Sequence, residues 1–226
     1  MTHILDNPIW NALVTGNKHF ASGNEQAKYI RRDVGPFAGL KTNSERELNE
    51  LHALLQEKSF VVLFTPGKIS IPAGWDIKLE KALLQMVYQP QYPPMAQDTE
   101  LIALQDEHIP AMLELTAMTK PGPFYSRTIE FGNYEGIFQE NTLVAMTGQR
   151  LQPDPYTEVS AVCTHPDHTG KGYAAKLISS QIHKITAVSR IPFLHVFTDN
   201  RAACKLYEKL GFRERKQMLV YMLEKA

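Results

Sequence analysis

The sequence has little of three features that point to particular classes of protein. Only two cysteines occur, Cys163 and Cys204, too few for a disulfide framework or a four-thiolate metal site. Lys plus Arg and Asp plus Glu number 24 each, so no excess charge attracts nucleic acid or an anionic membrane. No apolar run reaches the ~20 residues that span a bilayer, and the first residues do not resemble a secretory signal. We therefore expect a cytoplasmic protein without nucleic-acid or membrane partners.

The composition otherwise is that of a folded protein. Hydrophobic residues make up 43% of the 226 residues, and 14 prolines and 13 glycines are close to ordinary usage, which excludes disordered and collagen-like chains. At roughly 150 residues per domain, we expect one large domain or two small ones.

The N-terminal part contains one helix and one strand with clear signals. Ser44 and Glu47 form a capping box before three leucines at one-face spacing, Leu48, Leu51 and Leu55. The apolar run 60–65 then ends at Pro66-Gly67, which predicts a buried strand closed by a turn. Residues 89–97 carry three prolines and no apolar period, which is typical of a connection between two units. We place a boundary near Pro94, between an N-terminal domain of unclear role (1–94) and a second domain (95–226).

The second domain has regular periodicity. Apolar spacing, caps and turns predict the order β-α-β-β-β-α-β-α-β. The expected strands are 99–104, 135–139, 142–151, 157–164, 193–198 and 215–223, and the expected helices are 106–119, 172–185 and 200–210.

The most informative segment runs from the strand 157–164 through a glycine pair, Gly170 and Gly172, directly into a helix. Glycine allows close backbone approach, and the helix N-terminus adds unpaired N–H groups and about half a positive charge, which suits a pyrophosphate. Lys171 adds to this charge. A tight turn without a ligand is the alternative.

Two other interpretations of this segment carry less weight. Gly170, Gly172 and Ala175 fit the dinucleotide pattern G-x-G-x-x-A, which keeps a nicotinamide-dependent oxidoreductase as an alternative. A doubly wound domain needs several further βα units, however, whereas only about fifty residues follow here. His165, Asp167 and His168 lie together without a distant partner cluster, so we expect no metal site.

Two motifs resemble those of the GNAT superfamily of N-acetyltransferases. Residues 169–174 (TGKGYA) are similar to its coenzyme-A-binding signature [QR]-x-x-G-x-[GA], with Thr169 in place of arginine or glutamine. Residues 200–212 (NRAACKLYEKLGF) resemble its helix pattern N-x-x-A-x-x-L-Y-x-x-x-G-F. Within the superfamily, residues 119–128 and 143–151 look most like the glycine N-acyltransferase-like branch, whose extra domain resembles the N-terminal half.

The resemblance implies an α/β (α+β) fold with a mixed, mostly antiparallel central sheet flanked by helices, and an additional N-terminal α/β domain. It also implies that acetyl-CoA donates an acetyl group directly to the primary amine of a small molecule or amino acid, in a ternary complex. A non-catalytic acyl-CoA-binding module is the alternative, because Thr169 departs from the motif.

The resemblance also assigns roles to residues. The backbone from Val162 through Cys163 to Thr164 contacts the pantetheine arm, and Thr169, Gly170, Lys171, Gly172, Tyr173 and Ala174 hold the pyrophosphate. Asn200 contacts the cofactor or only caps its helix. Tyr207 protonates the departing thiolate or fills the core.

The acid–base and acceptor residues are chosen from the strands and the segment before the hairpin. Glu158 is our candidate base, with a solvated strand glutamate as the alternative, and period two places it on the face of Val162, opposite Cys163. Cys163 is then a buried structural thiol, and His195 is a satisfied interior or pocket-wall histidine. For the acceptor we select Arg127, which would grip a carboxylate or form a surface salt bridge, with three aromatic pocket candidates, Phe124, Tyr125 and Tyr134.

Overall fold

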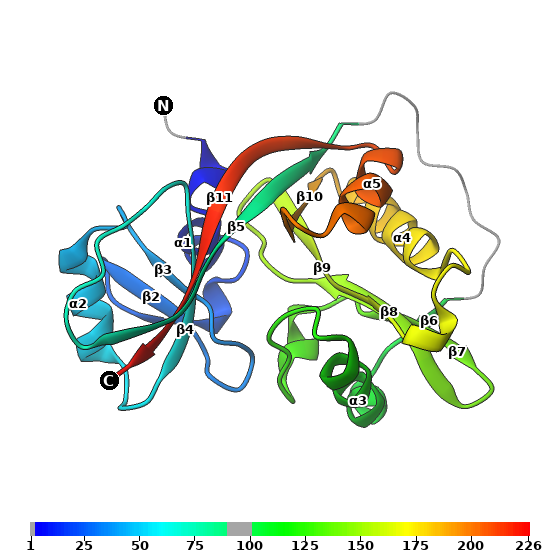
Figure 1. Cartoon of the computed structure of the whole chain (residues 1–226), viewed down its shortest axis with the longest axis horizontal. Helices are drawn as coiled ribbons and strands as arrows, with labels where there is room; N and C mark the ends of the chain where they lie inside the picture. Colours follow the sequence, from blue (N-terminus) through cyan, green and yellow to red (C-terminus); the bar gives the residue numbers. More distant parts are fainter. Residues whose placement is uncertain (1–2, 90–100) are drawn as a thin grey trace.

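The computed structural model describes residues 3–89 and 101–226, which form two sheets (Figure 1). The smaller sheet has the order β1-β2-β3, with β1 Ala21–Gly23, β2 Ala27–Ile30 and β3 Ala38–Leu40. The larger sheet has eight strands in the order β4-β11-β5-β10-β9-β8-β7-β6. Neighbours in it run antiparallel except β9 and β10, which are parallel, so the sheet is mixed and mostly antiparallel, as expected.

The small sheet packs against two short helices. Helix α1 (Pro8–Val14) follows the 3₁₀ turn η1 (Ile4–Asp6) and lies on β3, and helix α2 (Glu45–Leu54) contacts β2 and β3. The expected capping box is confirmed, because the Glu47 N–H donates to Ser44 Oγ and the Ser44 N–H donates to the Glu47 carboxylate. Strand β4 (Phe60–Thr65) is also found where the apolar run predicts it.

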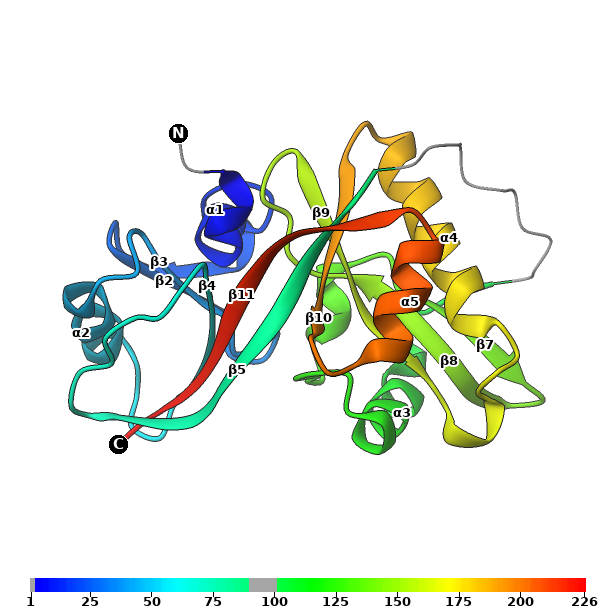
Figure 2. The same cartoon turned by 45° about the horizontal axis from the view of Figure 1, so that its top comes forward.

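Strands from both halves of the chain form the large sheet. The remaining strands are β5 Trp75–Tyr88, β6 Ile102–Ala103, β7 Glu135–Gln139, β8 Thr142–Gln149, β9 Tyr156–Thr164, β10 Ile191–Phe197 and β11 Phe212–Lys225. Strands β5 and β11 pair from Phe212–Tyr88 to Lys225–Trp75 and form a long twisted ribbon across the molecule (Figure 2). Strands β4 and β5 thus share one sheet with the C-terminal strands. The boundary near Pro94 lies outside the described residues, and the division at that point stays a prediction.

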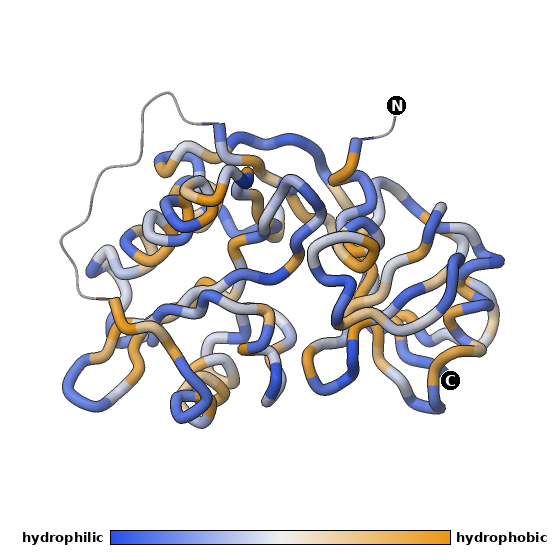
Figure 3. Tube along the Cα trace, turned by 180° about the vertical axis from the view of Figure 1, so that it is seen from behind, coloured by the Kyte–Doolittle hydropathy of each residue, from blue (hydrophilic) through white to orange (hydrophobic). Residues whose placement is uncertain are grey.

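Helices cover the two faces of the sheet. Helices α4 (Tyr173–Ala187) and α5 (Arg201–Lys209) lie on one face, and α3 (Ile109–Thr119) lies on the other, as Figure 2 shows. Along α4 apolar and polar residues alternate (Figure 3), and its apolar side is the expected one, Leu177, Ile178, Ile182 and Ile185, all buried. Short 3₁₀ turns fill three connections, at Asp106–His108, Thr128–Phe131 and Pro166–His168.

The expected element order is confirmed with small changes in bounds. In the described part of the expected strand 99–104, only β6 pairs, and its two residues hydrogen-bond to β7 at the sheet edge. The last strand is longer than expected because both of its sides find a partner, β4 and β5. No helix of the described residues has the length and apolar character needed to cross a membrane.

The close contact of α1 with β3 depends on a glycine. A Cβ at Gly39 would lie 2.5 Å from the Trp10 backbone nitrogen and 2.6 Å from its Cα, positions that a backbone cannot easily yield. We expect Gly39→Ala to lower the free energy of unfolding by about 2 kcal/mol, the usual cost of overpacking, in urea titrations followed by circular dichroism. Gly67→Ala is the control, since a Cβ there meets nothing within 4 Å. Equal stability of the two variants would contradict the prediction.

Candidate functional site

A large cavity lies where strands β9 and β10 separate. The two strands pair at only three positions, which end at Phe193 and Glu158. Beyond them lies a cavity of about 610 Å³, lined on the β9 side by residues 159–164 and on the β10 side by residues 195–197. An unpaired strand edge offers free N–H and C=O groups, so this edge of β9 can hydrogen-bond an extended ligand.

A bulge in β9 shapes this edge. Ala161 and Val162 together oppose Thr147 of β8, and Ala161 has φ of +52°, which is uncommon for a residue other than glycine. The bulge inverts the alternation of side chains. Cys163 therefore packs in the same core cluster as Phe193, on the side of Glu158, whereas Val162 packs with the opposite cluster. The expectation that Glu158 shares a face with Val162 and opposes Cys163 is wrong for this reason.

The cavity brings together five of the expected cofactor residues, Val162, Cys163, Thr164, Asn200 and Tyr207. Asn200 also accepts a hydrogen bond from the Ala203 N–H, so it caps α5 while it lines the cavity. Burial raises the pKa of the Cys163 thiol to about 11, which keeps it neutral and fits a structural thiol. Burial also raises the pKa of Tyr207 to about 12, so its phenol retains the proton that a departing thiolate would need.

The glycine turn follows β9 and leads into α4. Gly170 and Gly172 have φ of +76° and +78°, and a Cβ at either would meet nothing within 4 Å. Between described residues, no hydrogen bond uses the backbone N–H of Gly170, Lys171 or Gly172. These donors and the first turn of α4, at Tyr173 and Ala174, are therefore available to hydrogen-bond an anion. The Thr169 hydroxyl donates to the Pro166 carbonyl at 3.1 Å, so it supports the turn.

Glu158 lies behind the cavity wall. Its carboxylate accepts two hydrogen bonds from Arg150, at 2.8 and 2.7 Å, and one from His195 Nδ1 at 2.7 Å. Burial would raise the pKa of Glu158, but the Arg150 charge and these hydrogen bonds outweigh it and lower the pKa to about 2. The fully buried side chain is not a solvated strand glutamate, and the residues that line the cavity in front of it are Arg150 and His195.

His195 has a partner on each ring nitrogen. Nδ1 lies 2.7 Å from Glu158, and Nε2 lies 3.0 Å from the side-chain nitrogen of Gln85. Burial lowers the pKa of His195, and the nearby charges of Arg150 and Arg215 lower it further against the opposing effect of Glu158. The expectation of a satisfied pocket-wall histidine is therefore confirmed.

The charged side chains in the cavity lining are all cationic. They are Lys81, Lys120 and Arg150, and no carboxylate is among the described lining residues. The Arg150 guanidinium lies 4.7 Å from the Phe37 ring and 5.6 Å from the Phe64 ring, so it stacks on aromatic faces of the N-terminal half. The sequence interpretation missed Arg150, although an arginine that ends an apolar strand is a signal of a buried charge.

The four expected acceptor residues fall into two groups. Phe124 and Tyr134 line a small pocket that adjoins the cavity and shares Arg150 with it, and their ring centroids are 5.7 Å apart. Tyr125 and Arg127 line neither space. Arg127 donates to Glu130 and lies 3.8 Å from Asp106, which matches the surface salt bridge better than a substrate contact.

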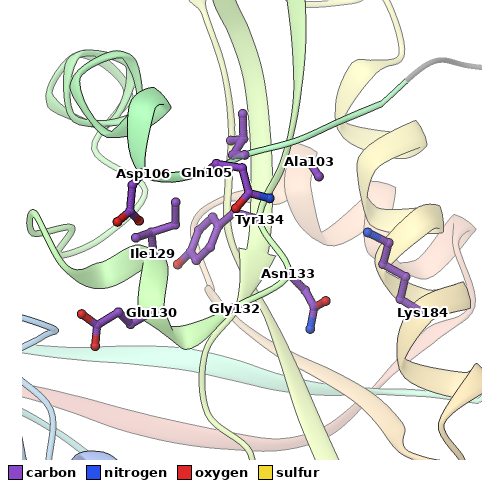
Figure 4. Close-up of a pocket in the computed structure, with 10 residues that line it drawn as sticks. Ala103, Gln105, Asp106, Ile129, Glu130, Gly132, Asn133, Tyr134 and Lys184 are labelled. Atoms are coloured by element: carbon purple, nitrogen blue, oxygen red, sulfur yellow. The ribbon is translucent and has the colours of Figure 1, made fainter.

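A separate pocket of about 300 Å³ opens on the other side of Tyr134 (Figure 4). Asn133 and Lys184 face it from one side, and Ile129 and Glu130 lie on the other. Its charged groups have partners, since Lys184 pairs with Glu135 at 2.9 Å and Glu130 pairs with Arg31 at 2.6 Å. In the described part of the chain, no three His, Cys, Asp or Glu side chains gather as metal ligands.

Solved structures of other proteins are similar to this chain in sequence or in fold. Residues 134–220 match the family model of the FR47-like proteins. A solved structure from Novosphingobium aromaticivorans, described as a GNAT-family acetyltransferase, is 33% identical, covers 100% of both chains and has a TM-score of 0.93. A GCN5-related N-acetyltransferase from Kribbella flavida is 15% identical over 96% of this chain and 94% of its own, with a TM-score of 0.61, which shows the fold alone. No curated protein matches the sequence.

The 33% identity over the whole chain shows the family. The protein belongs to the GNAT family of N-acetyltransferases, which use acetyl-CoA. The alternative of a nicotinamide-dependent oxidoreductase is also excluded. The sheet is mixed and mostly antiparallel, and it lacks the doubly wound architecture that a dinucleotide domain requires.

The expected binding of acetyl-CoA at the glycine turn can be tested at Gly172 with a matched control. Gly172→Asp places a negative charge at the expected pyrophosphate position, whereas Gly172→Asn adds the same bulk without charge and tolerates the same φ. We expect the dissociation constant for acetyl-CoA to rise more than tenfold for Asp, about 1.4 kcal/mol, and much less for Asn, by calorimetric titration. Wild-type affinity in a folded Gly172→Asp variant would place the pyrophosphate elsewhere.

Proposed function

We propose that this GNAT-family member transfers the acetyl group of acetyl-CoA to the primary amine of a small molecule or amino acid, by direct attack in a ternary complex. The observation that carries the proposal is the cavity between β9 and β10, where the unpaired β9 edge, Tyr207 and a cationic wall meet. The glycine turn would hold the pyrophosphate, and residues 162–164 would pair with the pantetheine arm. Acetyl-CoA supplies the activated thioester.

The charges of the cavity prepare the amine for attack. An amine must lose its proton before it attacks, and nearby positive charges lower the pKa of an ammonium. Arg150 and Lys81 are partly neutralised by Glu158 and Asp199, so the charge of Lys120 contributes most to favouring the neutral amine, and the proton leaves to solvent. The direct base role predicted for Glu158 is not supported by its position, since both of its oxygens are bonded and it lies behind Arg150 and His195. Glu158 acts instead by orienting these two side chains.

Tyr207 completes the reaction at the other end. Its phenol lines the cavity and keeps its proton, which it donates to the coenzyme A sulfur as the thioester bond breaks. Cys163 remains a neutral thiol, and this supports direct transfer without a covalent enzyme intermediate.

The acceptor side supports an amine that carries a carboxylate. The narrower likeness to the glycine N-acyltransferase-like branch suggests such an acceptor, and Arg127 was selected to bind it. Arg150 is better placed, because it lines both the cavity and the pocket of Phe124 and Tyr134. Its Nη1 makes no hydrogen bond to any other described residue and is left for a ligand, while Nε and Nη2 bind Glu158.

A non-catalytic acyl-CoA-binding module remains the second candidate, motivated by Thr169. The two are separated by thiol release from acetyl-CoA, measured with a panel of amino acids, polyamines and short peptides. An enzyme releases coenzyme A only when a suitable amine is present, whereas a binding module takes up the cofactor without release. The balanced charge of the chain gives no general attraction to nucleic acid or to an anionic membrane, which supports a small-molecule acceptor.

The proton donor is tested by removing one hydroxyl. Tyr207→Phe should lower kcat on the order of 10²-fold and leave the affinity for acetyl-CoA unchanged, because the ring still fills its place. Tyr88→Phe is the control, since Tyr88 packs in the same core cluster without lining the cavity. Unchanged turnover of Tyr207→Phe would assign Tyr207 to the core alone.

The acceptor contact is tested with two arginines. Arg150→Lys keeps a cation beside Glu158 but loses the planar fork, so the kcat/KM preference for a free carboxylate over its amide should fall about tenfold or more. Arg127→Met should leave that preference at its wild-type value. Circular dichroism and acetyl-CoA affinity serve as folding controls for Arg150→Lys. Loss of the preference in Arg127→Met instead would return the carboxylate contact to Arg127.

A further inference from the structure

Gln85 links His195 to the N-terminal segment of the chain. Gln85 on β5 lies directly opposite His195 on β10 in the antiparallel register, and its side chain is fully buried. The amide nitrogen donates to the Leu5 carbonyl at 2.9 Å and lies 3.0 Å from His195 Nε2. The amide oxygen accepts a hydrogen bond from Arg215 Nε.

These contacts fix which atoms carry protons. A guanidinium only donates, so the Gln85 oxygen must face Arg215, and its NH₂ group must face Leu5 and His195. His195 Nε2 can then only accept, which leaves it unprotonated. The remaining ring proton is on Nδ1, where it is donated to Glu158. A single neutral tautomer satisfies all of these contacts.

The Gln85 amide is itself held in place from the surface. Arg215 Nη2 lies 2.7 Å from an Asp6 oxygen, and Lys216 Nζ lies 3.0 Å from the same oxygen. Asp6 therefore orients Arg215, and Arg215 together with Leu5 prevents the amide from turning over. The 3₁₀ turn η1 thus contributes to a wall of the cavity that is distant from it in sequence.

We propose that Gln85 is a positioning residue that keeps His195 neutral, so that the Glu158 carboxylate stays bound to Arg150. Arg150 Nη2 and His195 Nδ1 share one oxygen of Glu158, Oε1. The neutral ring already donates its Nδ1–H to that oxygen, whereas an imidazolium would bind the oxygen more strongly and would add a positive charge beside Arg150. The catalytic consequence rests on the proposed function, whereas the protonation state of His195 does not.

The charged groups that face His195 influence whether its ring is protonated. Glu158 on β9 favours the imidazolium, and Arg150 after β8 and Arg215 on β11 oppose it, as burial does. Among the described residues, the ring nitrogens have two side-chain partners, Glu158 and Gln85. Of these, Gln85 is neutral, and its amide can present either a donor or an acceptor. Its orientation therefore decides between the tautomers.

The experiment replaces this amide with a group that can only accept. In Gln85→Glu, the new carboxylate bonds His195 Nε2 only if that nitrogen carries a proton, so His195 lies between two carboxylates and becomes charged. Long-range ¹H–¹⁵N spectra of ¹⁵N-histidine-labelled protein report both ring nitrogens, and His195→Gln identifies the signal. Gln217→Glu, exposed on β11 opposite Leu84, adds the same charge to the ribbon without touching His195.

In the wild type and in Gln217→Glu, we expect a bare Nε2, a protonated Nδ1 and no titration between about pH 5 and 8. In Gln85→Glu, both nitrogens should be protonated at neutral pH. Should Gln85→Glu not fold, Gln85→Met removes the donor, and His195 should then titrate within that range. A protonated Nε2 in the wild type, or identical His195 signals in the wild type and the Gln85 variant, would overturn the proposal.

Kinetics provide the second measurement. The ratio of kcat/KM in Gln85→Glu to that of the wild type should fall at acid pH and recover as pH rises through the His195 pKa, because only the charged ring disturbs Arg150. A merely structural loss lowers the ratio by one factor at every pH and would contradict the link to Arg150. If no amine is acetylated at all, the proposed function fails, while the spectra still decide the protonation state.

Discussion

The site depends on the short pairing of two parallel strands. Strands β9 and β10 hydrogen-bond at three positions and then diverge, and the bulge at Ala161 bends β9 at the start of the gap. The divergence leaves the β9 edge free for a ligand, opens the cavity, and directs the end of β9 into the glycine turn. Glu158 is the last paired residue, and its hydrogen bond to His195 joins the strands where they part. The cavity therefore begins where this short pairing ends, at Glu158 and Phe193.

The N-terminal half builds the opposite wall of the cavity. Strand β4 contributes Phe64 and β5 contributes Lys81, and the long β5–β11 ribbon joins β4 on one side to β10 on the other. Because β5 pairs with β10, Gln85 of the N-terminal half lies directly opposite His195 and contacts its ring. This wall of the cavity thus comes from a part of the chain that the coenzyme-A motifs do not include.

Local signals in the sequence predicted much of the fold but only one side of the site. The Ser44 capping box, the hairpin and the apolar face of α4 are set by neighbouring residues, and these elements formed as expected. The residues expected to bind the cofactor come from contiguous motifs, which a local pattern can reveal. The wall of Arg150, Phe37 and Phe64 depends on contacts between distant residues, which no local period encodes, and the bulge at Ala161 reverses the faces that strict alternation assigns. Strand β5 itself was not predicted, because its residues show no clear apolar period, and its pairing with β10 and β11 joins segments that are distant in sequence.

The buried charges are better explained by the shape of the cavity wall than by stability. Removing an ion pair such as Arg150–Glu158 from water costs about as much as the attraction returns, and an apolar pair of the same volume would stabilise the fold at least as well. Yet Glu158 receives three side-chain hydrogen bonds, and the groups that donate them are the ones that face the cavity. A carboxylate so placed holds a guanidinium and an imidazole at fixed angles, and Arg150 Nη1 makes no hydrogen bond to another described residue. The desolvation cost of these charges therefore falls where an oriented cation lines the cavity.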